Sequence, residues 1–219
     1  MPTVNICFHG IGTPRRELEP DEDGYWISRD LMLRVLDRVA ERSDVRLSFD
    51  DGNASDAEIA LPALQERGLT ATFFVLAGRL DRPGSLTRDD VRRLHTSGMK
   101  IGSHGMWHRP WRGIDAATAE QELVAARAML SDITRAPVQD AALPLGRYDR
   151  RLLARLRALD YSSVHTSDRR RARTDSWVQP RDSIRRSDTV NSVEGDVLRA
   201  PRLPARAKGA LAGTLKRLR

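Results

Sequence analysis

Apolar residues occur along this chain in two patterns, one of short continuous runs and one of longer periodic segments. The runs Thr3–His9, Val45–Phe49 and Leu69–Leu76 contain β-branched and aromatic residues and predict buried strands. Four further runs have the same character: Met99–Ser103, Val138–Leu143, Tyr161–Thr166 and Trp177–Ile184. The pattern therefore predicts about seven strands.

Periodic segments between these runs predict helices. Ser28 is the expected N-cap of a helix over about Arg29–Arg42, whose apolar residues fall on one face. Thr87, with Asp90 three residues later, resembles a capping box for a helix that ends before Gly98. Further helices are expected over about Ser55–Arg67, Asp115–Ile133 and Asp149–Leu159.

Repeated alternation of strand and helix predicts a parallel sheet with helices outside it. About seven strands suit a closed or nearly closed barrel, in which the chemistry lies at the carboxyl ends of the strands. We therefore expect one α/β domain, residues 1–198, followed by a basic tail, residues 199–219.

Composition supports a single globular domain. The chain has 219 residues, of which 40% are hydrophobic and 31% charged. It has no apolar run long enough to span a membrane and no signal-peptide pattern at its start, so a cytoplasmic location is expected. The single cysteine, Cys7, excludes an internal disulfide and a multi-cysteine zinc site, and we expect it to be a buried small side chain.

Positive charge is unevenly placed within the formal net charge of +7. The tail carries seven basic residues and no acidic ones, and Arg169–Arg173 is a second basic cluster. Basic segments of this kind could bind nucleic acid, anionic lipid or an acidic substrate. The alternative is that they form a solvated surface. No nucleic-acid module or aromatic platform is visible, so no nucleic-acid partner is expected.

Two histidines, His104 and His108, lie in the segment GSHGMWHRPW. Their four-residue spacing can place both imidazoles within reach of one ion, and neutral imidazole is a common zinc ligand. The alternative is two unrelated loop histidines. The pair therefore indicates a metal site only together with other ligands.

Two adjacent carboxylates, Asp50 and Asp51, end the strand-like segment LSFDDG. Their mutual repulsion would be offset by a cation bound to one of them, which leaves the other as a base. An ordinary Asp-Gly turn and a magnesium phosphatase site are the alternatives, although the further phosphate-holding groups of a phosphatase are not visible.

One carboxylate and two imidazoles together form the ligand set of catalytic zinc. Asp51, His104 and His108 are the candidate ligands of a divalent cation, with zinc favoured. Such a cation lowers the pKa of bound water, and Asp50 could take the proton. The reaction implied is hydrolysis of an amide or an ester.

The order of LSFDDG, GSHGMWH and the turn in AALPLG resembles the polysaccharide deacetylase family, carbohydrate esterase family 4. The resemblance implies a distorted (β/α) barrel and a metal-dependent deacetylase that acts on a glycan. It assigns the base to Asp50 and the metal ligands to Asp51, His104 and His108. It also places the turn with Pro144 along the acyl pocket, where the Leu145 N–H would face the oxyanion.

Two features depart from the family pattern. Ala142 stands where an arginine often orients the base, and Arg147 or Arg181 could take its place. No histidine follows His165, although the family usually has a late proton donor. We expect His165 to be buried or superficial, with entry into the pocket as the alternative, and His9 to pack behind the ligands.

Aromatic and basic segments suggest further contacts. Trp107 and Trp111 flank His108 and could stack on a sugar or pack the loop. The tail could form an amphipathic helix on anionic lipid, near a lipid-linked glycan, or be a frayed terminus. The alternative to an active enzyme is a non-catalytic homologue that binds metal and glycan.

Overall fold

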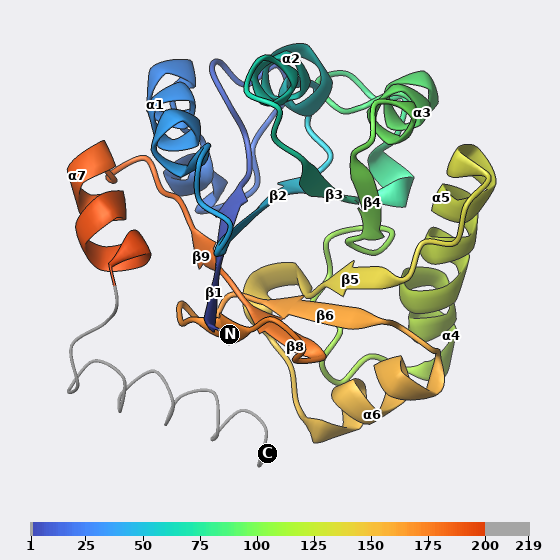
Figure 1. Cartoon of the computed structure of the whole chain (residues 1–219). Coiled ribbons are helices and arrows are strands. Elements are labelled where there is room, and N and C mark those ends of the chain that lie inside the picture. The colour runs from blue at the N-terminus through green and yellow to red at the C-terminus, as the bar shows by residue number, and fades with distance from the viewer. Residues whose placement is uncertain (1, 200–219) are drawn as a thin grey trace.

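Parallel strand pairing runs around the molecule in chain order in this computed structural model, which describes residues 2–199. The order is β1-β2-β3-β4-β5-β6-β8, with helices outside the strands (Figure 1). The strands are β1 (Pro2–Phe8), β2 (Val45–Asp51), β3 (Ala71–Val75), β4 (Lys100–Ser103), β5 (Asp140–Ala142), β6 (Ser163–Thr166) and β8 (Val178–Pro180). The predicted barrel of about seven parallel strands is confirmed.

The last strand segment brings the two edges of the sheet together. β8 pairs with β6, and β9 (Asp182–Ser183) pairs with β1. Only Arg181 separates β8 from β9, and its backbone N–H still donates to the Thr166 carbonyl oxygen of β6 at 2.9 Å before the chain turns to β1. The predicted strand Trp177–Ile184 is therefore split, and its two halves nearly close the barrel.

Helices cover the outer face of the barrel (Figure 1). Their bounds are α1 (Arg29–Val39), α2 (Leu61–Glu66), α3 (Arg88–Thr96), α4 (Ala116–Ala119), α5 (Ala126–Thr134), α6 (Arg150–Ala158) and α7 (Val190–Ser192). π-helical turns precede α2, join α4 to α5 and follow α7. The predicted Ser28 cap and the Thr87–Asp90 capping box are both present.

Two small elements were not predicted. The strand β7 (Ala172–Arg173) pairs antiparallel with the start of β1, and the helical segment from α7 to Leu198 packs near α1. Two residues are too few for a periodic signal in β7. The second segment does carry an apolar stripe, Val190, Val193, Val197 and Leu198, whose helical spacing could have predicted it.

Apolar packing lies mainly between the strands and the helices. Phe8, Phe49 and Phe73 stack across three neighbouring strands with ring centroids 5.1 and 4.8 Å apart. The barrel interior is more polar, because Arg181 and Asp50 form an ion pair inside it. This buried polar interior positions the site described below.

Membrane contact was expected only of the basic tail. Within residues 2–199, no helix combines the length and the apolar character needed to cross a bilayer. The amphipathic helix expected in the tail falls on residues 200–219, outside the described part of the chain.

Candidate metal centre

Three polar side chains meet at the carboxyl ends of β2 and β4. Asp51 Oδ1 lies 3.4 Å from His104 Nε2 and 3.6 Å from His108 Nε2. Two atoms bound about 2.1 Å from one tetrahedral zinc ion would lie roughly 3.4 Å apart. Asp51 Oδ1 is also buried without a hydrogen-bond donor among the described residues, as expected of an atom that faces a cation. The three residues therefore fit a divalent metal.

Three residues of this site have a strained backbone. Asp51, His108 and Leu145 have φ values of +77°, +56° and +55°, in the left-handed region that residues with a Cβ seldom adopt. Such conformations cost about 1–3 kcal/mol each and persist only where the surroundings hold them. The surrounding structure thus holds these three residues in an unfavourable backbone conformation at the site.

Hydrogen bonds to the Nδ1 atoms orient both imidazoles. His104 Nδ1 lies 2.9 Å from the carbonyl oxygen of Ala142 on β5, and His108 Nδ1 lies 2.5 Å from Glu19 Oε2. An acceptor beside Nδ1 holds the proton there and leaves the Nε2 lone pair free for a metal. Both Nε2 atoms face Asp51.

The loop that carries the histidines is tied to the helix layer by Glu122. This buried carboxylate accepts from the N–H groups of Met106 (2.7 Å) and Trp107 (3.3 Å) and from the indole N–H of Trp111 (3.4 Å). Trp111 is buried and packs the loop, whereas Trp107 is 38% exposed. Only Trp107 is accessible to a ligand, and the Arg82 guanidinium lies 4.9 Å from its ring.

Asp50, beside the three candidate ligands, is held by Arg181. Two hydrogen bonds of 2.6 Å join the guanidinium to both carboxylate oxygens, and a third of 3.1 Å reaches Ser48 Oγ. Both partners are buried. Burial raises the pKa of Asp50, but the charges of Arg181 and His104 outweigh it and lower the pKa to about 2. Asp50 is therefore ionised and fixed in orientation.

Charges within the site also affect the candidate ligands. Burial raises the pKa of Asp51, but the adjacent imidazoles of His104 and His108 hold it well below its usual range. Burial lowers the pKa of His104, but Asp50 and Asp51 outweigh burial and raise it. The buried anionic charge that favours a proton on His104 would favour a cation more strongly.

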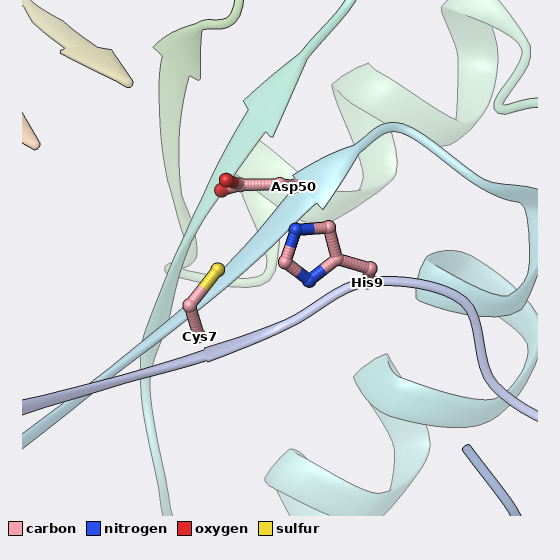
Figure 2. Close-up of side chains that lie close together, drawn as sticks. All are labelled: Cys7, His9 and Asp50. Carbon is pink, nitrogen blue, oxygen red and sulfur yellow. The ribbon is translucent and has the colours of Figure 1, made fainter. Parts of the chain in front are cut away.

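A second group of candidate ligands, drawn in Figure 2, consists of Cys7, His9 and Asp50. Arg181 already occupies both oxygens of Asp50, and burial raises the pKa of the Cys7 thiol. This group therefore does not fit a second cation. Cys7 is fully buried, in agreement with the expectation of a small core side chain.

A cavity of about 380 Å³ opens over the site. Asp50, Asp51, His104 and His108 line it together with His9, Glu19, Asp21, Tyr25, Leu143, Leu145, Arg147 and Ser167. His9 Nδ1 has no hydrogen-bond partner among the described residues, and burial lowers the pKa of His9. Leu145 is 55% exposed, while Pro144 before it is buried.

The structure places His165 away from this cavity. Its ring packs against Phe74 with centroids 4.7 Å apart, and its Nε2 lies 3.0 Å from Ser163 Oγ. It lines a different cavity, of about 540 Å³, with Lys100 and other residues at the starts of the strands. The Arg181 guanidinium lies 5.1 Å from the centre of the Phe74 ring, so Phe74 contacts both His165 and Arg181.

Sequence reasoning missed three residues that support the site. Glu19 and Arg79 contact each other beside His108, and Glu122 holds the histidine loop. Each lies in a segment without a recognisable motif, and only the tertiary structure brings it to the site. Of the two arginines considered for Asp50, Arg181 pairs with it, whereas Arg147 lines the cavity.

Comparison with known proteins shows a family relationship. The family model described as polysaccharide deacetylase matches residues 37–164. YxkH, a presumed polysaccharide deacetylase of Bacillus subtilis strain 168, is 22% identical over 178 residues, 74% of this chain and 63% of that protein. YheN, a presumed polysaccharide deacetylase of the same organism, is 31% identical over 110 residues, 49% of this chain and 38% of that protein. The chain thus spans less than two thirds of either relative.

Solved structures share the fold. The deacetylase PplD of Streptococcus pyogenes, in complex with acetate, matches with a TM-score of 0.79 and 17% identity over 92% of this chain and 99% of that one. A presumed polysaccharide deacetylase from Bacillus anthracis matches with a TM-score of 0.79 and 19% identity over 90% of this chain and 69% of that one. At such identities the likeness concerns the barrel and not the substrate.

Proposed function

This chain belongs to the polysaccharide deacetylase family, carbohydrate esterase family 4, and from that premise we propose that it is a metal-dependent deacetylase of an acylated amino sugar or glycan. The observation that carries the proposal is the convergence of Asp51, His104 and His108 beside the ionised carboxylate of Asp50. A carboxylate and two imidazoles suit zinc and leave coordination positions for water and substrate.

The proposed reaction is hydrolysis of an amide or ester bond to the acyl group. A divalent cation held by the three ligands would polarise the acyl carbonyl and lower the pKa of a water molecule. Asp50 takes a proton from the attacking water, in the orientation that Arg181 imposes. Because its pKa is low, Asp50 passes that proton on and does not retain it.

The leaving nitrogen or oxygen needs a proton, and we assign its delivery to His9. His9 lines the cavity, lies next to Asp50 (Figure 2) and has an Nδ1 atom without a partner among the described residues. Its lowered pKa makes it a ready donor once it has received a proton from Asp50. By this route the proton passes from water through Asp50 and His9 to the leaving group, and no late histidine is needed.

Other groups of the cavity are assigned to the substrate. The Leu145 N–H, on the strained turn after Pro144, is assigned to the developing oxyanion. Arg147 at the cavity and the accessible ring of Trp107 are candidate sugar contacts. The alternative of a non-catalytic homologue rests on the missing arginine at Ala142 and on the missing late histidine. The pairing of Arg181 with Asp50 favours the active enzyme.

Asp51→Asn tests the metal requirement. It is expected to lower zinc affinity by at least about 100-fold and to abolish acetate release from N-acetylglucosamine oligomers, because a neutral amide replaces the anionic ligand. Isothermal titration and an acetate assay measure the two effects. Asp81→Asn is a matched control, since Asp81 also has a positive φ but pairs with Arg88 at the surface.

The wild-type enzyme provides the opposing result. Chelation is expected to stop turnover and added zinc to restore it. Turnover that survives both chelation and Asp51→Asn would refute a metal-dependent deacetylase.

A further inference from the structure

The loop between β1 and α1, residues 9–28 and here called the β1–α1 loop, forms one wall of the cavity over the metal centre. Glu19, Pro20, Asp21, Glu22 and Tyr25 from this loop line that cavity. Leu145 and Arg147, from the turn after β5, also line it. The position of the loop therefore determines the shape of the space above the three candidate ligands.

Glu19 of this loop contacts a candidate metal ligand directly. Its Oε2 lies 2.5 Å from His108 Nδ1, and its Oε1 accepts a hydrogen bond from Arg79. His108 is itself in the left-handed backbone region, on a loop outside regular secondary structure. A carboxylate at Nδ1 fixes which nitrogen carries the proton and how the ring is turned.

The two candidate histidine ligands are supported in different ways. His104 Nδ1 faces the carbonyl oxygen of Ala142, which belongs to the barrel strand β5. His108 Nδ1 faces a charged side chain from the β1–α1 loop. The orientation of His104 is therefore set by the barrel, whereas that of His108 depends on a side chain from a connecting loop.

Further contacts hold Glu19 in position. Glu22 accepts from the backbone N–H of Glu19 at 2.8 Å and is itself bound by Arg16. Arg16 also donates to Asn53 Oδ1 at 2.9 Å, two residues after Asp51. The loop is thus tied on one side to the segment that carries Asp51 and on the other, through Glu19, to His108.

From these contacts we propose that Glu19 is a positioning residue that orients His108 for the cation and couples cation binding to the β1–α1 loop. The inference rests on the proposed metal site. Coupling is reciprocal: if the ordered loop favours the cation, the cation stabilises the loop by the same free energy. Cation binding would then also complete one wall of the substrate cavity.

Glu19→Ala tests this inference through binding of zinc itself. The variant is expected to bind zinc about 10- to 100-fold more weakly than the wild type, the usual effect of removing such a partner. Glu19→Gln, which keeps the shape but loses the charge, is expected to fall between the two. Glu58→Ala is the matched control, because Glu58 pairs with Arg15 of the same loop at an exposed position.

Two readouts separate positioning from a general loss of structure. In the wild type, zinc is expected to slow amide hydrogen exchange in residues 12–25, and Glu19→Ala is expected to remove this protection. The ¹⁵N resonances of His108 are expected to report a proton on Nδ1 in the wild type and a mixture of tautomers in Glu19→Ala. Glu58→Ala should match the wild type in both measurements.

Zinc affinity of Glu19→Ala within twofold of the wild type, with zinc-dependent loop protection intact, would overturn the inference. Failure of the proposed function would look different. A wild-type protein that binds zinc but releases no acetate would contradict the deacetylase assignment. The effect of Glu19 on zinc affinity could still be measured in that case. A wild type that does not bind zinc would overturn both.

Discussion

Asp50→Asn is expected to lower the turnover number for deacetylation by about 10²- to 10⁴-fold, the range for loss of a general base. The amide cannot take the proton that Asp50 would receive from water, although it keeps the shape of the side chain. Zinc affinity is expected to change far less than in Asp51→Asn, because Arg181 and not the cation binds Asp50. Steady-state kinetics and zinc titration on the same preparations measure this difference.

A control is needed because Asp50→Asn also leaves the buried Arg181 without its anion. Asp140→Asn is a suitable one, since Asp140 is a buried aspartate on a barrel strand that pairs with Lys100. Asp140 lines the cavity at the other end of the barrel. The control is expected to lose stability but to retain turnover. Equal losses of turnover in the two variants would show that Asp50 has only a structural role.

Arg181→Met is expected to reduce the free energy of unfolding by about 3–5 kcal/mol, the usual cost of breaking a buried ion pair from one side. Methionine fills much of the space beside Phe74 but leaves the carboxylate of Asp50 buried without its partner. Denaturant unfolding measures the change, and turnover should fall as Asp50 loses its orientation.

The double variant Asp50→Asn/Arg181→Met identifies the cause of that loss. Because both buried charges are then removed, it is expected to be more stable than Arg181→Met alone. If the two single effects on stability simply added, the coupling between Asp50 and Arg181 would be absent, and another explanation of the conformation of Asp50 would be required.

Local sequence patterns were sufficient for most of the barrel. Strands such as Val45–Phe49 and helix caps such as Ser28 depend mainly on residues close by in the sequence. They could therefore be predicted from the sequence alone. The division of the last strand at Arg181 could not. It depends on pairing with two different strands, β6 and β1, which are far from it in the sequence.

The candidate ligands lie in two short motifs, which explains why they could be proposed together. The residues that support the candidate ligands could not be predicted in this way. Glu19, Arg79 and Glu122 reach the site from separate segments, and no spacing links them to His108 or to Met106. Arg181 could be named only as one of two arginines, because its pairing with Asp50 depends on closure of the barrel.

His165 illustrates the limit of reasoning from strand ends. Its position near the end of β6 suggested that it could face the catalytic rim. Which cavity a side chain lines also depends on the residues that pack against it, here Phe74. The location of the His165 side chain therefore depends on tertiary packing, which the sequence pattern does not show.

Anomalous diffraction from zinc-soaked crystals, collected on both sides of the zinc edge, tests the central claim most directly. The account predicts one strong peak about 2.0–2.2 Å from an Asp51 carboxylate oxygen and from the Nε2 atoms of His104 and His108. A zinc peak bound elsewhere, or a fully soaked crystal with no peak between these three residues, would contradict it.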